Sequence, residues 1–424
     1  MWDYSDHLLF QGNLKKGYLM NIFSGKRIVL GVTGSIAAYK AAALASTLAK
    51  SGAQVDTILT EPASKLISPM TFSALTGRKA YLDEDLWKGD DHVLHIDLGE
   101  NNQAFLIAPA TANTIAKLAQ GLADNLLTLT ALASRTQIAV APAMDGGMYS
   151  HPATQANLAL LRERGVHIWG PAAGHMASGL SGKGRMLEPE LLAGHLRQLL
   201  GREGVLKGKK VVVTAGGTQE PIDPVRVISN RSSGKQGYAI AQAALDAGAD
   251  VILISGPVSL FSPVGAKMVQ VTTAAEMAEA VLAETEGADL LIMAAAVADY
   301  RPLQPAHQKI KKDQEGLQTL RLEGTEDILQ GLAARKKESG IGPVIMIGFA
   351  AETENLLENA RAKLERKDLD LIAANDVSGQ DAGIGADLNQ VLLIWRDGRT
   401  KDLGLLPKFD IAKALIEEAA SLLA

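Results

Sequence analysis

Residues 209–237, KKVVVTAGGTQEPIDPVRVISNRSSGKQG, constrain the fold more than any other stretch of the chain. The stretch opens as an apolar run, breaks at residues 215–218 (AGGT), and continues through polar residues with no hydrophobic period. A helical pattern begins at Ser232-Ser233-Gly234-Lys235. Glycine lets a backbone approach a phosphate, and the free N–H groups of a helix start point toward it. The stretch therefore predicts a strand, a glycine turn and a helix start that together hold an anion.

Short apolar runs alternate with helical patterns along the rest of the chain. A second strand-then-glycine unit spans Ile28–Lys40. The predicted strands are Arg27–Thr33, Val55–Thr60, Ala104–Ala108, Gln137–Val140 and Val166–Trp169, and then Lys210–Thr214, Asp250–Ile254, Asp289–Met293, Val344–Phe349, Leu369–Ala373 and Val391–Trp395. This alternation predicts an α/β protein with two Rossmann-like three-layer domains and mostly parallel sheets, whose ligands lie beyond the carboxyl ends of the strands.

The pattern also suggests domain boundaries. Residues 1–25 match neither a signal peptide nor the pattern that follows, so we expect an N-terminal extension outside the fold. We expect a first domain at 26–200, closed by a helix from Glu188, and a glycine- and charge-rich linker at 201–208. A second domain at 209–424 follows, and we find no sequence repeat between the two.

Composition narrows the class of protein. The formal net charge is −5 with both signs interspersed, and aromatic residues make up only 4%, which argues against a nucleic-acid or anionic-membrane partner. The chain has no cysteine, which excludes disulfides, thiolate metal sites and cysteine nucleophiles. We find no apolar run long enough to span a bilayer. A soluble enzyme or binding protein is expected.

Distinctive polar residues follow several of the predicted strands. Gly34-Ser35 in isolation is equally typical of an ordinary turn with a serine cap, but residues 109–113 (PATAN) and 142–149 (PAMDGGMY) suggest a surface shaped for a flat ligand. A lone histidine in an apolar run, such as His95, is more often a core residue than a catalyst. In the second half, Asp299 follows a strand, where it could bind a metal or a hydroxyl. Lys363 and Lys367 lie four residues apart, which by itself indicates only a soluble helix face.

Many separate motifs resemble one family. The segments GVTGSIAAYK (31–40), HIDLG (95–99), APATANT (108–114), GLADNLLT (121–128) and APAMDGGMY (141–149) resemble flavin-dependent cysteine decarboxylases. The stretch at 216–237, together with AAAVADYRP, KIKK, GFAAET and AANDVSG, is similar to a ligase half. From about residue 26 to the C-terminus, the chain resembles the bacterial bifunctional phosphopantothenoylcysteine decarboxylase/phosphopantothenate–cysteine ligase family of coenzyme A biosynthesis.

For the first half, the resemblance implies an FMN site and a decarboxylase. It implies that flavin oxidises the cysteine moiety beside sulfur, that CO₂ leaves from the resulting thioaldehyde, and that hydride returns. His95 matches the family's essential histidine, for which proton transfer is the expected role. The implied cofactor contacts are Gly34, Ser35, Thr60, Ser73, Pro109, Ala110, Thr111 and Asn113.

Two positions depart from the family pattern. Asp145 replaces the usual asparagine, whose amide is expected to hold the substrate. Three roles remain open for it: a protonated acid, a partner for the amide N–H of the substrate, or a residue displaced from the substrate. In the glycine-rich segment Gly174–Met186, which resembles a mobile substrate clamp, Ser178 replaces a cysteine proton donor. Ser178 is a far weaker acid than a thiol, so His175 is an alternative donor.

For the second half, the resemblance implies activation of 4′-phosphopantothenate by CTP with Mg²⁺, and attack of L-cysteine on the acyl-cytidylate. Lys309 is expected to stabilise the phosphorus centre or the departing pyrophosphate, and Asn230 to bind the acyl-cytidylate carbonyl. Arg226 is expected near the substrate, with a partner subunit as one possible source. The implied nucleotide and substrate contacts are Met293, Ala294, Ala295, Asp299 (also a candidate metal ligand), Glu326, Asp327, Ile328, Leu329, Phe349, Lys363 and Lys367. The stretch at 326–329 departs from the family's usual asparagine-proline-aspartate form.

The leading hypothesis is a cytoplasmic bifunctional enzyme that forms a homo-oligomer, with a dodecamer implied by the resemblance. A second hypothesis is a working ligase whose flavin domain binds FMN without completing turnover, because of Asp145 and Ser178. A third is a flavoprotein binding or regulatory module. A nicotinamide dehydrogenase is disfavoured, because neither glycine turn has the G-x-G-x-x-G spacing.

Overall fold

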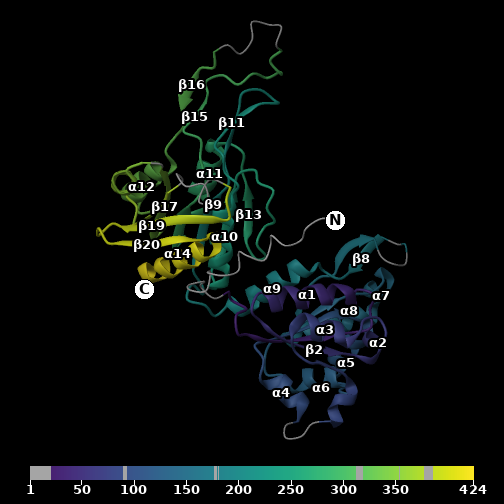
Figure 1. Cartoon of the computed structure of the whole chain (residues 1–424). Coiled ribbons are helices and arrows are strands. Elements are labelled where there is room, and N and C mark those ends of the chain that lie inside the picture. Colours follow the sequence, from purple (N-terminus) through teal and green to yellow (C-terminus); the bar gives the residue numbers. More distant parts are fainter. Residues whose placement is uncertain are drawn as a thin grey trace, which may run out of the picture. The chain divides into compact units, whose positions relative to one another are not determined.

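The computed structural model describes residues 21–88, 93–175, 179, 181–311, 319–352, 354–376 and 385–424 of the chain. The contacts divide it into two compact units, one ending at Gly201 and the other beginning at Arg202. We call them the first unit and the second unit (Figure 1).

The first unit is built on a six-stranded parallel sheet with the strand order β3-β2-β1-β4-β5-β6. The strands are β1 (Arg27–Val32), β2 (Gln54–Leu59), β3 (Ala80–Tyr81), β4 (Ala104–Ala110), β5 (Ile138–Pro142) and β6 (His167–Ile168). The helices are α1 (Ala38–Lys50), α2 (Glu61–Ser64), α3 (Pro69–Thr76), η1 (Asp83–Trp87), α4 (Leu94–Glu100), α5 (Ala112–Gln120), α6 (Leu126–Ala133), α7 (Gly146–Ser150), α8 (Pro152–Glu163) and α9 (Pro189–Gly201).

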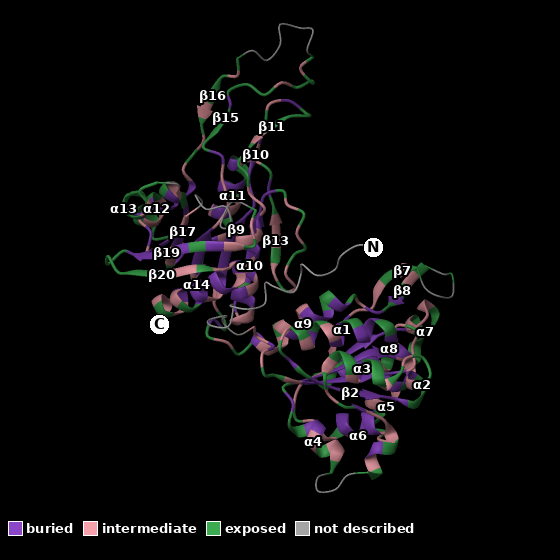
Figure 2. Cartoon of the chain, viewed as in Figure 1, coloured by how far each residue is buried: buried purple, intermediate pink, exposed green. Residues whose placement is uncertain are grey.

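Alternate residues of each central strand pack into different cores. In β1, Ile28 and Leu30 join a core that includes residues of α1, α3 and α9, whereas Val29 joins a core with residues of α5, α6 and α8. Both faces of the sheet are therefore covered, as the continuous apolar runs predict. Figure 2 shows the buried strands between half-buried and exposed helices.

Two details of the first unit differ from the expectations. Phe23 is only 2% exposed and packs in the core, so the fold begins before the expected boundary at residue 26. The expected loop at 174–186 contains an antiparallel hairpin of β7 (Ala172–His175) and β8 (Ser181–Arg185). Backbone pairing therefore orders the two ends of the stretch despite its glycines. Ser178 lies outside the described residues.

The second unit has an eight-stranded sheet with the order β13-β12-β9-β14-β17-β18-β19-β20. It is parallel up to β18, and β19 and β20 add antiparallel strands at one edge, which confirms a mostly parallel sheet. The strands are β9 (Lys210–Ala215), β12 (Asp250–Ser255), β13 (Lys267–Gln270), β14 (Leu290–Met293), β17 (Ile345–Glu352), β18 (Leu371–Asp376), β19 (Leu388–Trp395) and β20 (Thr400–Pro407).

Helices again cover both faces of this sheet. Residues of α10 (Lys235–Asp246) and α14 (Lys408–Leu423) belong to one core, and residues of α11 (Ala274–Glu284), α12 (Ile328–Ser339) and α13 (Leu356–Arg366) belong to the other. Leu206, in the expected linker, is 1% exposed and packs in the core with α10 and α14. Part of the expected linker therefore belongs to the second unit.

Two small antiparallel hairpins extend from the second unit. They are β10 (Gln219–Pro221) with β11 (Val227–Ser229), and β15 (Tyr300–Pro302) with β16 (Leu322–Gly324). Figure 1 shows β11, β15 and β16 beyond the edge of the sheet, in a projection that we call the arm. Sequence periodicity predicts neither hairpin, because each strand has only three residues.

Candidate active sites

The first unit has a cavity of about 630 Å³ beyond the carboxyl ends of β1, β4 and β5. Strand order reverses between β1 and β4, which is where open α/β sheets bind ligands. The cavity is lined by Gly34, Ser35, Ile36, Ala37, Tyr39, Lys40, Thr111, Ala112, Ala143, Met144, Asp145, Met148, His175, Gly184, Arg185 and Met186.

A buried threonine joins the two strands at this point. Thr33 is 1% exposed; its Oγ1 donates to the Pro109 carbonyl oxygen at 2.7 Å and accepts from Thr111 N at 3.1 Å. A Cβ atom at Gly34 would lie 2.5 Å from the Cβ of Pro62, so a larger residue would displace the turn. Glycine here keeps the backbone close to the cavity floor.

Four of the predicted cofactor and substrate contacts line this cavity: Gly34, Ser35, Thr111 and Asp145. Five others do not line it, namely Thr60, Ser73, Pro109, Ala110 and Asn113. The Oγ1 of Thr60 is buried and has no hydrogen-bond partner within the described structure. The hydroxyl of Ser73 accepts from Ala80 N at 3.1 Å. Pro109 and Ala110 belong to β4, and Asn113 is exposed in the first turn of α5.

Asp145 has a local structural role as the N-cap of α7. Its Oδ1 accepts a hydrogen bond from Gly147 N at 2.9 Å. His175, the alternative proton donor, also lines the cavity, and its Nδ1 lies 2.6 Å from the hydroxyl of Ser181. The hairpin therefore brings a titratable ring to the cavity.

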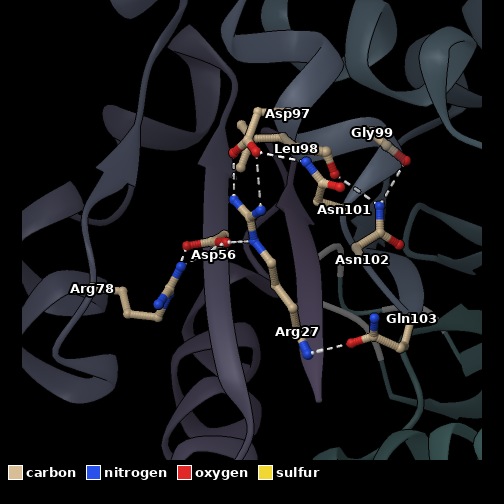
Figure 3. Close-up of polar contacts among 9 residues, drawn as sticks. All are labelled: Arg27, Asp56, Arg78, Asp97, Leu98, Gly99, Asn101, Asn102 and Gln103. Atoms are coloured by element: carbon tan, nitrogen blue, oxygen red, sulfur yellow. Dashed lines mark hydrogen bonds and ion pairs between the residues drawn. The ribbon is translucent and has the colours of Figure 1, made fainter. Parts of the chain in front are cut away.

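His95 does not line the cavity. It lies half-buried on α4, which packs mainly against α6. The helix is held through Asp97, whose carboxylate accepts from both terminal nitrogens of Arg27 at 3.3 and 2.7 Å. Arg27 Nε also donates to Asp56 at 2.6 Å, and Asp56 in turn accepts from Arg78 (Figure 3). The hydrogen bond with Asp97, offset in part by burial and reinforced by Asp56, raises the pKa of Arg27 above its ordinary value.

Sequence reasoning missed Lys40, which is 5% exposed and lines the same cavity. Its Nζ donates to the Met186 carbonyl oxygen at 3.2 Å and to Glu188 at 2.8 Å. Lys40, together with Arg185, lowers the pKa of the Glu188 carboxyl. No sequence signal separates Lys40 from an ordinary lysine on a helix surface.

The second unit has a cavity of about 380 Å³ at the corresponding reversal of strand order, between β9 and β14. Of the predicted residues, it is lined by Asn230, Met293, Ala294, Ala295, Asp299, Glu326, Asp327, Ile328, Leu329, Phe349, Lys363 and Lys367.

Buried threonines also join the strand ends here. Thr214 Oγ1 accepts from Ala295 N at 3.1 Å, and Thr218 Oγ1 accepts from Ala298 N at 2.9 Å. Asn230 donates its side-chain amide to the Val297 carbonyl oxygen at 2.9 Å, which fixes that side chain at the cavity wall. The turn after β9 and the loop after β14 thus form one rigid floor.

Two lysines that line this cavity take part in ion pairs. Lys363 bonds to Glu352 at 2.5 Å, and Lys367 pairs with Asp327 at 3.1 Å. These lysines were assigned only through the family resemblance, and their helix spacing by itself indicated nothing more than solubility. In the described parts of the chain, no group of three or more histidine, aspartate or glutamate side chains is placed to hold a metal ion.

Arg226 and Lys309 do not line the cavity. Arg226 donates to Asp223 at 2.9 and 2.5 Å and to the Ile310 carbonyl oxygen at 3.0 Å, so it lies beside the segment that carries the exposed Lys309. Hydrogen bonds from Arg226, reinforced by the backbone N–H groups of residues 225, 226 and 310, hold the pKa of Asp223 well below its usual range. The arm therefore presents two cations together.

Further polar residues line the second cavity, among them Lys235, Asn375, Asn389 and Lys408. The helix-start motif identified Lys235 as a cation without assigning it a ligand. Asn389 and Lys408 follow the glycine-rich strand ends by more than a hundred residues, so only the fold brings them together.

Of the helices that the structure describes, none is long and apolar enough to cross a membrane.

Comparisons with known proteins match both units. The first unit matches a family model described as Flavoprotein over residues 21–201. The second matches the DNA/pantothenate metabolism flavoprotein C-terminal domain over residues 206–423. The coenzyme A biosynthesis bifunctional protein of Bacillus subtilis (strain 168) is 44% identical over 404 residues, which are 95% of this chain and 98% of the relative. Its Escherichia coli (strain K12) counterpart is 44% identical over 400 residues, 93% of this chain and 97% of the relative.

Solved structures match the units separately. The crystal structure of the C-terminal domain of a coenzyme A biosynthesis bifunctional protein has a TM-score of 0.44 and 39% identity, covering 52% of this chain and 98% of that one. A PPC decarboxylase mutant complexed with pantothenoylaminoethenethiol has a TM-score of 0.39 and 34% identity, covering 41% of this chain and 97% of that one.

Proposed function

Because the chain belongs to the family of coenzyme A biosynthesis bifunctional proteins, we propose that its two units catalyse consecutive reactions. The second unit joins 4′-phosphopantothenate to L-cysteine with CTP, through an acyl-cytidylate. The first unit decarboxylates the resulting phosphopantothenoylcysteine to 4′-phosphopantetheine with FMN. The observation that carries this proposal is that each unit has its own cavity at a reversal of strand order, the first largely apolar and the second lined by lysines.

The residues of the first cavity fit a flavin. Its volume lies within the usual range for cofactor sites, and Gly34 keeps the turn flat. The buried and unpaired hydroxyl of Thr60 is available to a phosphate that approaches the end of β2. When bound, FMN supplies the redox step at the carbon beside sulfur. The chain's own contribution is to hold the substrate in this cavity and to move protons. His175, which lines the cavity, is the proposed proton donor there, and His95, outside the lining, keeps the role that the family motif implies.

An ionised carboxylate at position 145 would disfavour direct contact between Asp145 and the substrate carboxylate. A charge pair of like sign costs about 1 kcal/mol at 4 Å in bulk water and more when shielded. Because Asp145 caps α7 and lines the cavity, we propose that it accepts the amide N–H of the substrate's pantothenoyl arm. This role keeps the carboxylate ionised and places the reacting end of the substrate elsewhere in the cavity.

In the second unit, Lys363 and Lys367 are proposed to bind the nucleotide and Asn230 the activated carbonyl. Mg²⁺ commonly binds proteins through one or two carboxylates plus substrate phosphates, so Asp299 at the cavity edge suits that role once CTP is bound. Neutralising the triphosphate lets the substrate carboxylate attack the α-phosphorus and release pyrophosphate. The amine of cysteine then attacks the acyl carbonyl of the acyl-cytidylate, forms the amide and releases CMP.

Lys309 and Arg226 are proposed to act on the cavity of another copy of the chain, since both lie on the arm outside their own cavity. A homo-oligomer, a dodecamer in its full form, and a cytoplasmic location are parts of the same proposal.

Mixing a Lys309→Met protein with an Asn230→Ala protein tests whether Lys309 acts on the cavity of another subunit. If each alone is inactive, dissociation and random reassembly into two-fold pairs should restore about a quarter of wild-type ligation. No recovery after demonstrated subunit exchange would place Lys309 in its own subunit's site.

The decarboxylase half is tested first, with purified protein, FMN, phosphopantothenoylcysteine and no CTP. Mass spectrometry should find 4′-phosphopantetheine, with one CO₂ released per product. A product two hydrogens lighter would mean that the return reduction fails. Absence of turnover, together with cysteine-dependent consumption of CTP in a parallel assay, would favour a ligase whose flavin domain does not complete the reaction.

A further inference from the structure

A buried lysine lines the second cavity without a carboxylate partner. Lys408, the first residue of α14, is 9% exposed, and its Nζ donates to the carbonyl oxygens of Ala386 and Leu388. Among the described residues, no carboxylate lies within ion-pair distance of this ammonium group. Burial is the main cause that lowers the pKa of Lys408, with Lys235 adding to it.

The acid that acts on Lys408 is already engaged. Asp387 opposes the lowering of the pKa of Lys408 by burial and by Lys235, but it pairs with Lys235 at 2.6 Å. Carbonyl dipoles satisfy two of the three N–H donors of an ammonium group but do not neutralise its charge. Removing such a charge from water costs free energy that a bound anion would offset.

Lys235 belongs to the same wall of the cavity. It is the first residue of α10, and hydrogen bonds tie the starts of α10 and α14 together. Gln236 donates to the Lys408 carbonyl oxygen at 3.1 Å and accepts from Asn389 at 2.8 Å. Two helix starts, of 12 and 16 residues, therefore converge here with their lysines, and their positive ends add to the charge of the lysines.

The two pairs of lysines in this cavity differ in their surroundings. Lys363 and Lys367 each have a carboxylate partner: Glu352, which is outside the lining, and Asp327, which lines the cavity. Lys408 has none among the described residues, and the partner of Lys235 is 85% exposed at its side chain, so it can turn away into water at little cost. The wall with Lys235 and Lys408 is therefore the more attractive one for an added anion.

We propose that Lys408 and Lys235 form a phosphate-binding subsite of the ligase cavity, distinct from the wall formed by Lys363 and Lys367. The proposal rests on the function proposed above and extends it. A phosphate monoester is the ligand chemistry, and two sources present it: the terminal phosphate of 4′-phosphopantothenate or a phosphate of CTP. Loss of either lysine weakens the binding of that one ligand more than the binding of the other.

Binding is measured before turnover, so that failure of the ligase assignment is distinguishable from failure of the subsite. Calorimetry on the full chain would use 4′-phosphopantothenate, dephosphorylated pantothenate and CTP with Mg²⁺ as separate probes. Lys408→Met and Lys235→Met should each raise the Kd of one phosphorylated probe about tenfold or more, since hydrogen bonds to charged groups carry this much affinity. A selective loss for 4′-phosphopantothenate assigns the subsite to the substrate, and a selective loss for CTP assigns it to the nucleotide.

A matched control is Lys413→Met, on the same helix but outside the cavity lining. This variant should leave the Kd values of the two phosphorylated probes unchanged. If Lys408→Met lowers stability while all Kd values stay within twofold, Lys408 only supports the backbone of residues 386–388. Lys235→Met, at a more exposed position, then decides the matter: unchanged binding in both variants overturns the subsite. If the wild type binds neither phosphorylated probe, the ligase assignment itself is wrong.

Discussion

Each unit has a prominent group of ion pairs, and the two groups lie at opposite ends of similar sheets. In the first unit, Arg27, Asp56 and Arg78 meet near the amino end of β1, whereas the cavity lies beyond its carboxyl end. In the second unit, Lys363, Lys367 and Asp327 line the cavity, and Lys363 and Lys367 pair with Glu352 and Asp327. The same strand order thus carries a largely apolar site in one unit and a charged site in the other.

The two groups of ion pairs also differ in their burial and in the number of hydrogen bonds that hold them. The Asp56 side chain is 1% exposed and accepts three hydrogen bonds from two arginines, so it is shielded from any competing anion. Asp327 lines the second cavity, so a bound phosphate group can compete with it for Lys367. Buried pairs away from a site hold structure, whereas pairs on a cavity wall can exchange partners with a ligand.

The largest expected effect is on the buried network of Figure 3. Asp56→Ala leaves two guanidinium groups without their shared partner, and breaking a buried pair typically costs about 3–5 kcal/mol. Hydrogen–deuterium exchange should show faster opening of β1, β2 and α4, with the second unit unchanged. Asp124→Ala is the control, since its pair with Lys117 is 61% exposed on the carboxylate side and should contribute less than about 1 kcal/mol. Equal effects of the two substitutions would refute the distinction.

A smaller effect is expected from the charged cavity wall. Lys363→Met should lower kcat/KM for CTP by about 10–100-fold, the usual worth of a hydrogen bond to a charged group, with little change in stability. Flavin absorbance of the first unit should stay as in the wild type. The control is Lys401→Met, whose pair with Glu418 at 2.7 Å lies outside the cavity lining. Unchanged CTP kinetics in Lys363→Met would remove this lysine from the site.

The sequence predicts the central strands and the fold class well. Apolar runs such as Lys210–Thr214 and Asp250–Ile254 are confirmed within one residue, because strands buried on both faces must be continuously apolar. The edge strands β13 and β20 were missed. Their residues are mostly half-buried or exposed, so they lack such a run.

The strand-end residues of the sites could also be predicted from the sequence. Glycine and proline set the backbone conformation directly, so their positions after an apolar run show where a strand ends. Residues such as Lys40 and Lys408 could not, since their role depends on burial that only the packed helices create. For Arg226 and Lys309, motifs located the residues but not their distance from the cavity. That distance depends on hairpins of three-residue strands that leave no periodic signal.

The smallest expected effect concerns the pH dependence of the first unit. The ring of His195 stacks on Trp169, with the ring centres 5.2 Å apart, and burial followed by the nearby His167 lowers the pKa of His195. The unfolded chain therefore binds a proton more readily than the folded chain below about pH 6.5, so stability falls as the pH drops through that region. His195→Phe keeps the stack and removes the titration. The midpoint of thermal unfolding of the first unit should therefore fall less between pH 7.5 and pH 5.5 in this variant than in the wild type. His307→Gln, at an exposed position in the second unit, should not change the fall. If the unfolding midpoint of His195→Phe falls with pH as steeply as that of the wild type, other groups cause the acid sensitivity of the first unit. His167 is then the first residue to examine.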